Sequence, residues 1–226
     1  MCHALLVWEE VTGGRSGVRV TRQDGVYRKE SADPRVDLVG EGERLRWLRR
    51  RGIPAAEVLE CRPGLLVTAA VPGRPAGDPA RVAGALADLT RQLHAVPVTV
   101  CPFDRRLAVT VPEALAAEPD LDDLDEERRG WTRDRLVAEL LATRPADEDL
   151  VVCHGDLTLD NVLFDPDTCR VTGVLDAGRL GVADRWVDLA IATRSLGSAA
   201  SRFLARYGVA VDPAKLAFYR LLDEFG

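Results

Sequence analysis

Three polar residues along one stretch of the chain have the types and the order needed to handle a phosphate group and its metal ion. Asp156 follows a His-Gly pair, Asn161 comes after four intervening residues, and Asp176 ends an apolar run. A carboxylate beside an amide oxygen supplies the hard oxygen ligands that Mg²⁺ takes in proteins. Another carboxylate can accept or orient the proton of an attacking hydroxyl. The stretch therefore predicts magnesium-dependent phosphoryl transfer, with Asp156 as the catalytic group and Asn161 and Asp176 as metal ligands.

The order of these residues matters more than any one of them, because single Asp and Asn residues in loops mostly form turns. A catalytic-loop Asp, an Asn after a four-residue gap and a later Asp-x-Gly make up the protein-kinase pattern. Residues 162–164 and 171–175 are short β-prone runs on either side of a turn sequence at 165–168, so we predict a hairpin. The hairpin would bring Asn161 and Asp176 to the same end.

A further acidic residue, Asp188, has a different predicted role. It lies in the segment 185–190, a predicted helix whose apolar positions indicate burial. Because a buried carboxylate needs partners, we predict that Asp188 is an anchor that hydrogen-bonds the catalytic loop. His94 follows an amphipathic helix predicted over 79–93, and we interpret it as a capping or core histidine, since a cation suits a helix C-terminus.

The N-terminal part reads as strands joined by glycine turns. Residues 7–11, 18–21 and 26–29 are β-prone, and a glycine-rich turn covers 12–17. Backbone amides of such a hairpin can cover the phosphates of ATP, although glycine turns are common in proteins of every kind. We take Gly14, Ser16 and Gly17 as candidate nucleotide-binding residues of this turn. Lys29 ends the strand after the loop, where the kinase pattern places the lysine that pairs with the α- and β-phosphates.

The composition restricts the partners and the compartment. The chain has 226 residues, a formal net charge of −6 and five cysteines without CxxC spacing. An acidic protein attracts cations, and its net charge disfavours nucleic acid, whose recognition rests on basic patches. The cysteine pattern argues against a zinc site or a disulfide framework. No apolar run approaches the roughly 20 residues that span a bilayer, and the start lacks a secretion signal. We expect a cytoplasmic monomer or weak dimer with no membrane or nucleic-acid partner.

The motifs HGDLTLDN at 154–161, VLDAGRLGVADRWVDLA at 174–190 and FYRLLDEF at 218–225 resemble those of the aminoglycoside phosphotransferases, most of all the aminoglycoside 3'-phosphotransferases. The resemblance covers nearly the whole chain. It implies an α+β, two-lobed protein-kinase-like fold with an N-lobe antiparallel sheet (1–71) and a mainly helical C-lobe (72–226). It also implies transfer of phosphate from ATP, with Mg²⁺, to the 3'-hydroxyl of kanamycin- or neomycin-type antibiotics, which confers resistance.

The resemblance assigns further residues to the nucleotide. Glu41, in a predicted helix, matches the glutamate that pairs with the phosphate-binding lysine, and Glu43 competes for that role. An ion pair of this kind orients the lysine rather than stabilising the fold. Ala69 and Val71 match the linker whose backbone groups read the adenine edge.

The resemblance also assigns residues to the antibiotic. Seven of the ten residues from 118 to 127 are acidic, which by itself fits a solvated loop and helix start. In the family an acidic loop at this position grips the ammonium groups of the substrate. The residues that match the family's antibiotic site are Asp123, Asp125 and Glu126 in this loop, Arg179 after the Asp-Ala-Gly motif, and Asp223 and Glu224 near the C-terminal end.

Several positions depart from the family pattern. These departures affect the identity of the acceptor more than the transfer of phosphate. Asp160 stands where proline is common, Ser195 where the 3'-kinases have a substrate-binding Asp, and Gly226 where they have a second Phe; the N-terminus is also shorter. The loop VTGGRSG and the turn CPFDRRL, with the closing Gly, are shared with the streptomycin 3''-phosphotransferases. Streptomycin or another small-molecule hydroxyl is therefore an alternative acceptor, and a non-catalytic nucleotide- or antibiotic-binding protein is a further alternative.

Overall fold

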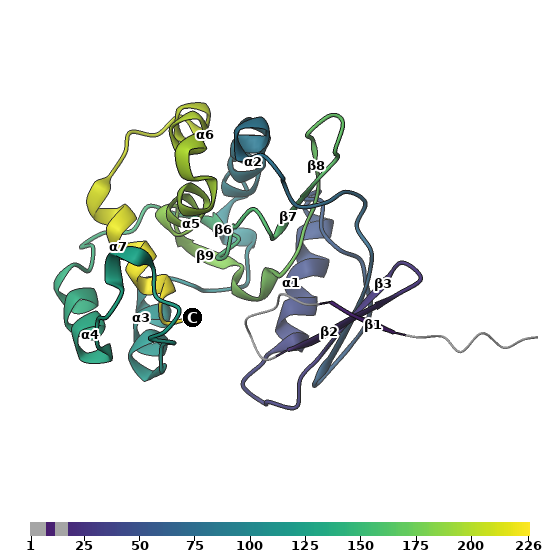
Figure 1. The fold of residues 1–226 in the computed structure, drawn as a ribbon, viewed down its shortest axis with the longest axis horizontal. Coiled ribbons are helices and arrows are strands. Elements are labelled where there is room, and N and C mark those ends of the chain that lie inside the picture. The colour runs from purple at the N-terminus through teal and green to yellow at the C-terminus, as the bar shows by residue number, and fades with distance from the viewer. Residues whose placement is uncertain (1–7, 12–17) are drawn as a thin grey trace, which may run out of the picture. The chain divides into compact units, whose positions relative to one another are not determined.

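The computed structural model describes residues 8–11 and 18–226, and contacts within the chain define two compact units (Figure 1). The first unit comprises Met1–Ala76 and Asp160–Gly178, and the second comprises Gly77–Leu159 and Arg179–Gly226. The segment that carries Asn161 and Asp176 thus groups with the N-terminal sheet. The lobe boundary expected after residue 71 stays a prediction.

The first unit is built on a five-stranded antiparallel sheet in the order β1-β2-β3-β5-β4, with helix α1 packed against β4 and β5. The two-residue turn at Asp24 and Gly25 has positive φ at both positions and joins β2 to β3, the geometry that matches the twist of a hairpin. The elements of the sheet are β1 Glu9–Glu10, β2 Arg19–Gln23, β3 Val26–Glu30, β4 Val58–Arg62 and β5 Leu65–Ala69, and α1 spans Leu38–Arg50.

The predicted hairpin is confirmed. Strand β7, Val162–Phe164, pairs antiparallel with β8, Val171–Val174. The side chain of Asp165 accepts the N–H of Thr168 at 2.8 Å, which closes the turn in the way that Asp favours. The N–H of Leu175 donates to the carbonyl of Asn161 at 2.9 Å. The backbone therefore holds Asn161 beside the strand end that leads into Asp176.

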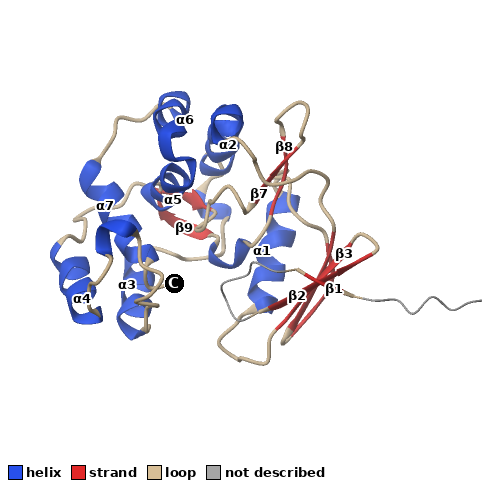
Figure 2. Cartoon of the chain, viewed as in Figure 1, coloured by secondary structure: helices blue, strands red, loops and turns tan. Residues whose placement is uncertain are grey.

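The second unit is mainly helical (Figure 2), with one small antiparallel pair of strands. Helix α5 contacts α2, α6 and α7, and its fully buried residues include Asp188. Asp78 caps α2 through its side chain and Pro79 follows at the first helical position, which is a strong start signal. The elements are α2 Pro79–His94, α3 Leu107–Ala116, α4 Arg133–Ala142, β6 Leu150–Cys153, β9 Gly181–Asp184, α5 Trp186–Leu196, α6 Ala200–Tyr207 and α7 Pro213–Asp223.

Two further findings concern membranes and disulfides. Among residues 8–11 and 18–226, no helix has the length and apolar character needed to cross a bilayer. The four cysteines in that part of the chain form no disulfide.

Candidate active site

The first unit brings Lys29 together with two carboxylates. The Nζ of Lys29, on β3, lies 2.7 Å from Oε1 of Glu41 on α1 and 3.3 Å from Oδ2 of Asp176 after β8. The predicted pairing of Lys29 with Glu41 is therefore present. The Glu41 side chain is 7% exposed and that of Asp176 is 51% exposed, so Glu41 holds the lysine from within while Asp176 faces solvent.

Electrostatics keep Lys29 charged in this position. Burial would lower the pKa of the ammonium group, but the charges of Glu41 and Asp176 outweigh it, and the pKa of Lys29 lies above its ordinary value. One cation shared by two carboxylates leaves a formal charge of −1 on the three groups. With Asn161 held beside the same strand end, the half-exposed carboxylate of Asp176 meets the requirement of Mg²⁺ for hard oxygen ligands. Asn161 and Asp176 are the residues of this unit that could hold the ion.

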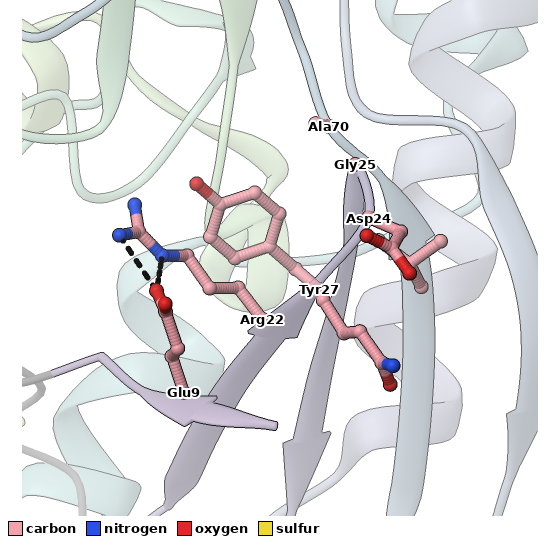
Figure 3. A pocket seen from close by; sticks show the side chains of 8 residues that line it. Glu9, Arg22, Asp24, Gly25, Tyr27 and Ala70 are labelled. Atoms are coloured by element: carbon pink, nitrogen blue, oxygen red, sulfur yellow. Dashed lines mark hydrogen bonds and ion pairs between the residues drawn. The ribbon is translucent and has the colours of Figure 1, made fainter. Parts of the chain in front are cut away.

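A pocket of about 350 Å³ lies at the β2–β3 hairpin of the first unit (Figure 3). The Tyr27 ring and the Arg22 side chain lie side by side there, and Arg22 is paired with Glu9 at 2.9 Å. Tyr27 stands two residues before Lys29 on β3, so both side chains leave the same face of the sheet. Gly25 and Ala70 also line the pocket. We did not single out Tyr27 from the sequence, although the alternation of side chains along the strand would have identified it.

The structure leaves the predictions for the adenine and for the loop over the phosphates untested. The N–H of Ala69 donates to the carbonyl of Glu57, directly before β4, at 2.8 Å, so this donor already has a partner within the first unit. Recognition of a base by Ala69 and Val71 stays a prediction. Gly14, Ser16 and Gly17, predicted to cover the phosphates, lie outside the described residues.

In the second unit, Asp188 fixes the backbone that precedes Asp156. The N–H of His154 donates to Oδ2 of Asp188 and that of Gly155 to Oδ1, each at 2.8 Å. The predicted anchor role of Asp188 is thus confirmed. Gly155 has φ +89°, and a Cβ there would come within 2.3 Å of the backbone oxygen of Arg179, so only glycine fits this turn. The half-buried Asp156 is presented by a loop with little freedom.

The predicted antibiotic-binding carboxylates Asp125 and Asp223 share a counter-ion that we did not predict. Arg194, in the last turn of α5, lies 3.1 Å from Oδ2 of Asp125 and also pairs with Asp223. Arg179 lies 2.8 Å from Oδ1 of Asp223, so it pairs with one of the predicted antibiotic-binding carboxylates. These carboxylates are therefore positioned by guanidinium groups.

Glu224 is more buried than a substrate-binding carboxylate needs to be. Its side chain is 6% exposed and lies 3.2 Å from Arg128, while it accepts the N–H of Asp125 at 3.2 Å. Burial is the main reason why the pKa of Glu224 lies above its ordinary value, and the nearby Asp125 adds to it. In this geometry Glu224 fastens the acidic loop to the end of α7.

The remaining acidic-loop residues of the prediction, Asp123 and Glu126, are exposed.

The structure shows what surrounds two of the positions that depart from the family pattern. The Ser195 hydroxyl accepts the N–H of Leu159 at 2.8 Å, which ties α5 to the catalytic loop. A Cβ at Gly226 would come within 2.4 Å of the guanidinium of Arg179, so the arginine occupies the space that a larger residue would need.

Arg128 and Arg194 are partners of the predicted site carboxylates that sequence reasoning missed in this unit. Arg194 and Asp125 are 69 positions apart in the chain, and Arg128 and Glu224 are 96 apart. No local spacing connects such pairs, and arginine is common throughout this chain, so the sequence carried no signal for them.

The chain is similar to known phosphotransferases over nearly its whole length. The model of the phosphotransferase enzyme family matches residues 7–221. The chain is 51% identical to the aminoglycoside 3'-phosphotransferase of Streptomyces fradiae, over 96% of this chain and 94% of that protein. It is 40% identical to the streptomycin 3''-kinase of Streptomyces griseus, over 96% of this chain and 91% of that protein.

Solved structures agree with these similarities. The crystal structure of aminoglycoside-3'-phosphotransferase of type VIII superimposes with a TM-score of 0.89 at 50% identity, covering 98% of this chain and 94% of the other. An aminoglycoside phosphotransferase from Streptomyces rimosus, solved in complex with ADP and streptomycin, gives 0.82 at 34% identity, covering 96% of this chain and 92% of the other. The predicted α+β, protein-kinase-like fold is confirmed.

Proposed function

Since this chain belongs to the phosphotransferase enzyme family, we propose that it transfers the γ-phosphoryl group of ATP to the 3'-hydroxyl of an aminoglycoside of the kanamycin or neomycin type. The observation that carries the proposal is the grouping of Lys29, Glu41 and Asp176 in a chain that is 51% identical to an aminoglycoside 3'-phosphotransferase. Phosphorylation of the drug by this chain would confer resistance.

On the nucleotide side, Lys29 pairs with the α- and β-phosphates and Glu41 keeps its side chain extended. Asn161 and Asp176 would hold Mg²⁺, which would supply positive charge to neutralise the phosphate oxygens. The Tyr27 ring offers a stacking surface for the adenine, next to the linker that contains Ala69 and Val71. Gly14, Ser16 and Gly17, which lie outside the described residues, stay candidates for phosphate binding from the sequence alone.

On the acceptor side, Asp156 accepts the proton of the sugar hydroxyl as its oxygen attacks the γ-phosphorus and ADP departs. Catalysis of this kind consists mainly of positioning and charge stabilisation, which fits the rigid backbone before Asp156. The exposed Asp123 and Glu126 meet substrate ammonium groups directly. The same groups approach Asp125 and Asp223, whose side chains are 28% and 14% exposed, while Glu224 holds the loop in place.

The test is magnesium-dependent release of ADP with kanamycin, neomycin, lividomycin and streptomycin as acceptors, with the product position determined by NMR. The proposal expects turnover with kanamycin and neomycin and none with lividomycin, which lacks the 3'-hydroxyl. The Asp156→Asn variant is the control and should bind nucleotide without turnover. Turnover with lividomycin as fast as turnover with kanamycin would contradict the 3' assignment.

A streptomycin 3''-kinase is the second candidate, favoured by the 40% identity to the Streptomyces griseus enzyme and by the Ser195 and Gly226 departures. Release of ADP with streptomycin alone would establish it. Tight antibiotic binding without any release of ADP would favour the remaining alternative, a non-catalytic binding protein.

A further inference from the structure

A continuous chain of polar contacts in the second unit leads from a surface ion pair to the catalytic loop. Arg185 donates to Asp149 at 3.0 Å and to the hydroxyl of Tyr207 at 3.1 Å. Tyr207 lies 2.8 Å from Nδ1 of His94, and Nε2 of His94 lies 3.0 Å from Oδ2 of Asp188. The His94 side chain is 4% exposed and that of Asp188 is not exposed at all.

The donors and acceptors of this chain assign the tautomer of His94. A carboxylate only accepts and a guanidinium only donates. Burial raises the pKa of Tyr207, so the phenol keeps its proton. Because the Tyr207 oxygen accepts from Arg185, its O–H is available to Nδ1 of His94. A neutral His94 therefore carries its hydrogen on Nε2 and donates it to Asp188.

Asp188 connects His94 to the backbone of the catalytic loop. Its two oxygens accept the N–H groups of His154 and Gly155, the residues directly before Asp156. Burial alone would raise the pKa of Asp188, but the hydrogen bond from His94, the electrostatic interactions with His94 and His154, and the N–H of Gly155 outweigh it, so the pKa lies below its usual value. The carboxylate that orients the loop is thus ionised and depends on His94 for one of its donors.

We propose that His94 is a positioning residue for phosphoryl transfer. Its Nε2–H fixes the rotamer of Asp188, Asp188 orients the backbone before Asp156, and Tyr207, held by Arg185, selects the tautomer of His94. The inference rests on the role proposed for Asp156 above, since His94 controls the orientation of the Asp156 side chain.

Two substitutions at His94 separate positioning from packing. The amide of His94→Gln would keep a donor near the place of Nε2, whereas the side chain of His94→Leu fills space without donating. We expect His94→Leu to lower kcat by about 10- to 100-fold, the loss typical when a hydrogen-bond partner behind an active-site group is removed. The KM values for ATP and acceptor should change by less than roughly threefold, because ground-state binding is retained. His94→Gln should recover most of kcat, and Tyr207→Phe should fall between the two.

The chain offers a matched control between the same two helices. Arg206 on α6 pairs with Asp88 on α2 at 2.9 Å, and both side chains are exposed. Asp88→Asn removes a contact between α2 and α6 and should leave kcat unchanged. An equal fall of kcat in Asp88→Asn and His94→Leu would mean that His94 only joins the helices, and it would overturn the proposal.

NMR tests the same inference without any acceptor. In ¹⁵N-labelled protein, Nε2 of His94 should carry a hydrogen at its contact with Asp188, and Tyr207→Phe should add a population protonated on Nδ1. Amide exchange at His154 and Gly155 should be faster in His94→Leu than in the wild type and in His94→Gln. An Nδ1–H ring in the wild type, or exchange that is the same in all three proteins, would contradict the proposal even if the acceptor named above proves wrong.

Discussion

Each unit of the molecule carries a group of carboxylates that the sequence assigned to ligands, and the two groups differ in how they are balanced by cations. In the first unit, Glu41 and Asp176 share the single ammonium group of Lys29. In the second unit, three carboxylates are matched by three guanidinium groups. The members of this second group are Asp125, Asp223 and Glu224 with Arg128, Arg179 and Arg194.

The difference shows that residue type alone does not say what a carboxylate will bind. Excess negative charge on a half-exposed oxygen, as at Asp176, attracts a metal ion. Carboxylates matched by arginine are held in place instead, since the planar guanidinium fixes carboxylate geometry. In the second unit the excess negative charge lies on the exposed acidic residues of the loop. These are Glu118, Asp120, Asp122, Asp123, Glu126 and Glu127, of which Glu118 pairs with Arg133.

The largest expected effect comes from Asp156, which belongs to neither group. We expect Asp156→Ala to lower kcat by about 10²- to 10⁴-fold, the usual contribution of a positioned base. Affinity for nucleotide should be unchanged because the nucleotide groups are in the first unit. Steady-state kinetics together with ADP binding by calorimetry measure both quantities. A turnover within threefold of wild type would remove Asp156 from the reaction.

Tyr27 tests nucleotide binding by the first unit separately from its charged groups, because the side chain carries no charge. Loss of a stacking ring typically costs about 1–3 kcal/mol per base, so Tyr27→Ala should raise the KM for ATP by roughly 5- to 150-fold. The KM for the acceptor should not change. Tyr27→Phe keeps the ring and serves as the control; if it weakened ATP as much as Tyr27→Ala, the hydroxyl rather than the ring would be responsible.

Asp223 tests the matched group of the second unit. Its side chain is 14% exposed and pairs with both Arg179 and Arg194. Asp223→Asn leaves two guanidinium groups without this charge, and we expect a loss of about 1–3 kcal/mol in the free energy of unfolding, measured by urea denaturation. Glu126→Gln, in an exposed position, should leave stability unchanged and raise only the acceptor KM. Equal stability of the two variants would argue against a positioning role for the arginines.

Ser195 should show the smallest effect. Ser195→Ala removes one hydrogen bond, to the N–H of Leu159, for which a cost of about 0.5–1.5 kcal/mol in unfolding free energy is typical. Thermal denaturation measures this change, with Ser195→Thr as the variant that keeps the hydroxyl. A stabilised Ser195→Ala protein would show that the tie to the catalytic loop is not favourable.

The sequence predicted local structure well where the pattern was local. The hairpin around residues 165–168 follows from β-prone runs and an Asp-rich turn, and α2 follows from the helical spacing of its apolar residues. The helical spacing of residues 131–144 allows Leu136, Leu140 and Leu141 to face inward, but the structure leaves Leu141 51% exposed. Helical spacing permits both Leu140 and Leu141 to face a core, and only the neighbouring elements decide between them.

The candidate site was predictable as a set of residues and not as a set of contacts. Lys29, Asp156 and Asp176 stand in motifs with fixed order, and resemblance supplied Glu41. The pairing of Asp125 and Asp223 through Arg194 joins three distant segments, so it depends on how the helices pack. The consequence is that the sequence overstated the negative charge offered by Asp125, Asp223 and Glu224.

The central claim is that the first unit's excess carboxylate serves a metal ion while the second unit's matched carboxylates do not. Calorimetric titration of ATP into wild type, Asp176→Asn and Asp223→Asn, each with and without Mg²⁺, tests it most directly. We predict that Mg²⁺ strengthens ATP binding in the wild type and in Asp223→Asn, and that Asp176→Asn loses most of this dependence. Full Mg²⁺ dependence in Asp176→Asn, or its loss in Asp223→Asn, would contradict the claim.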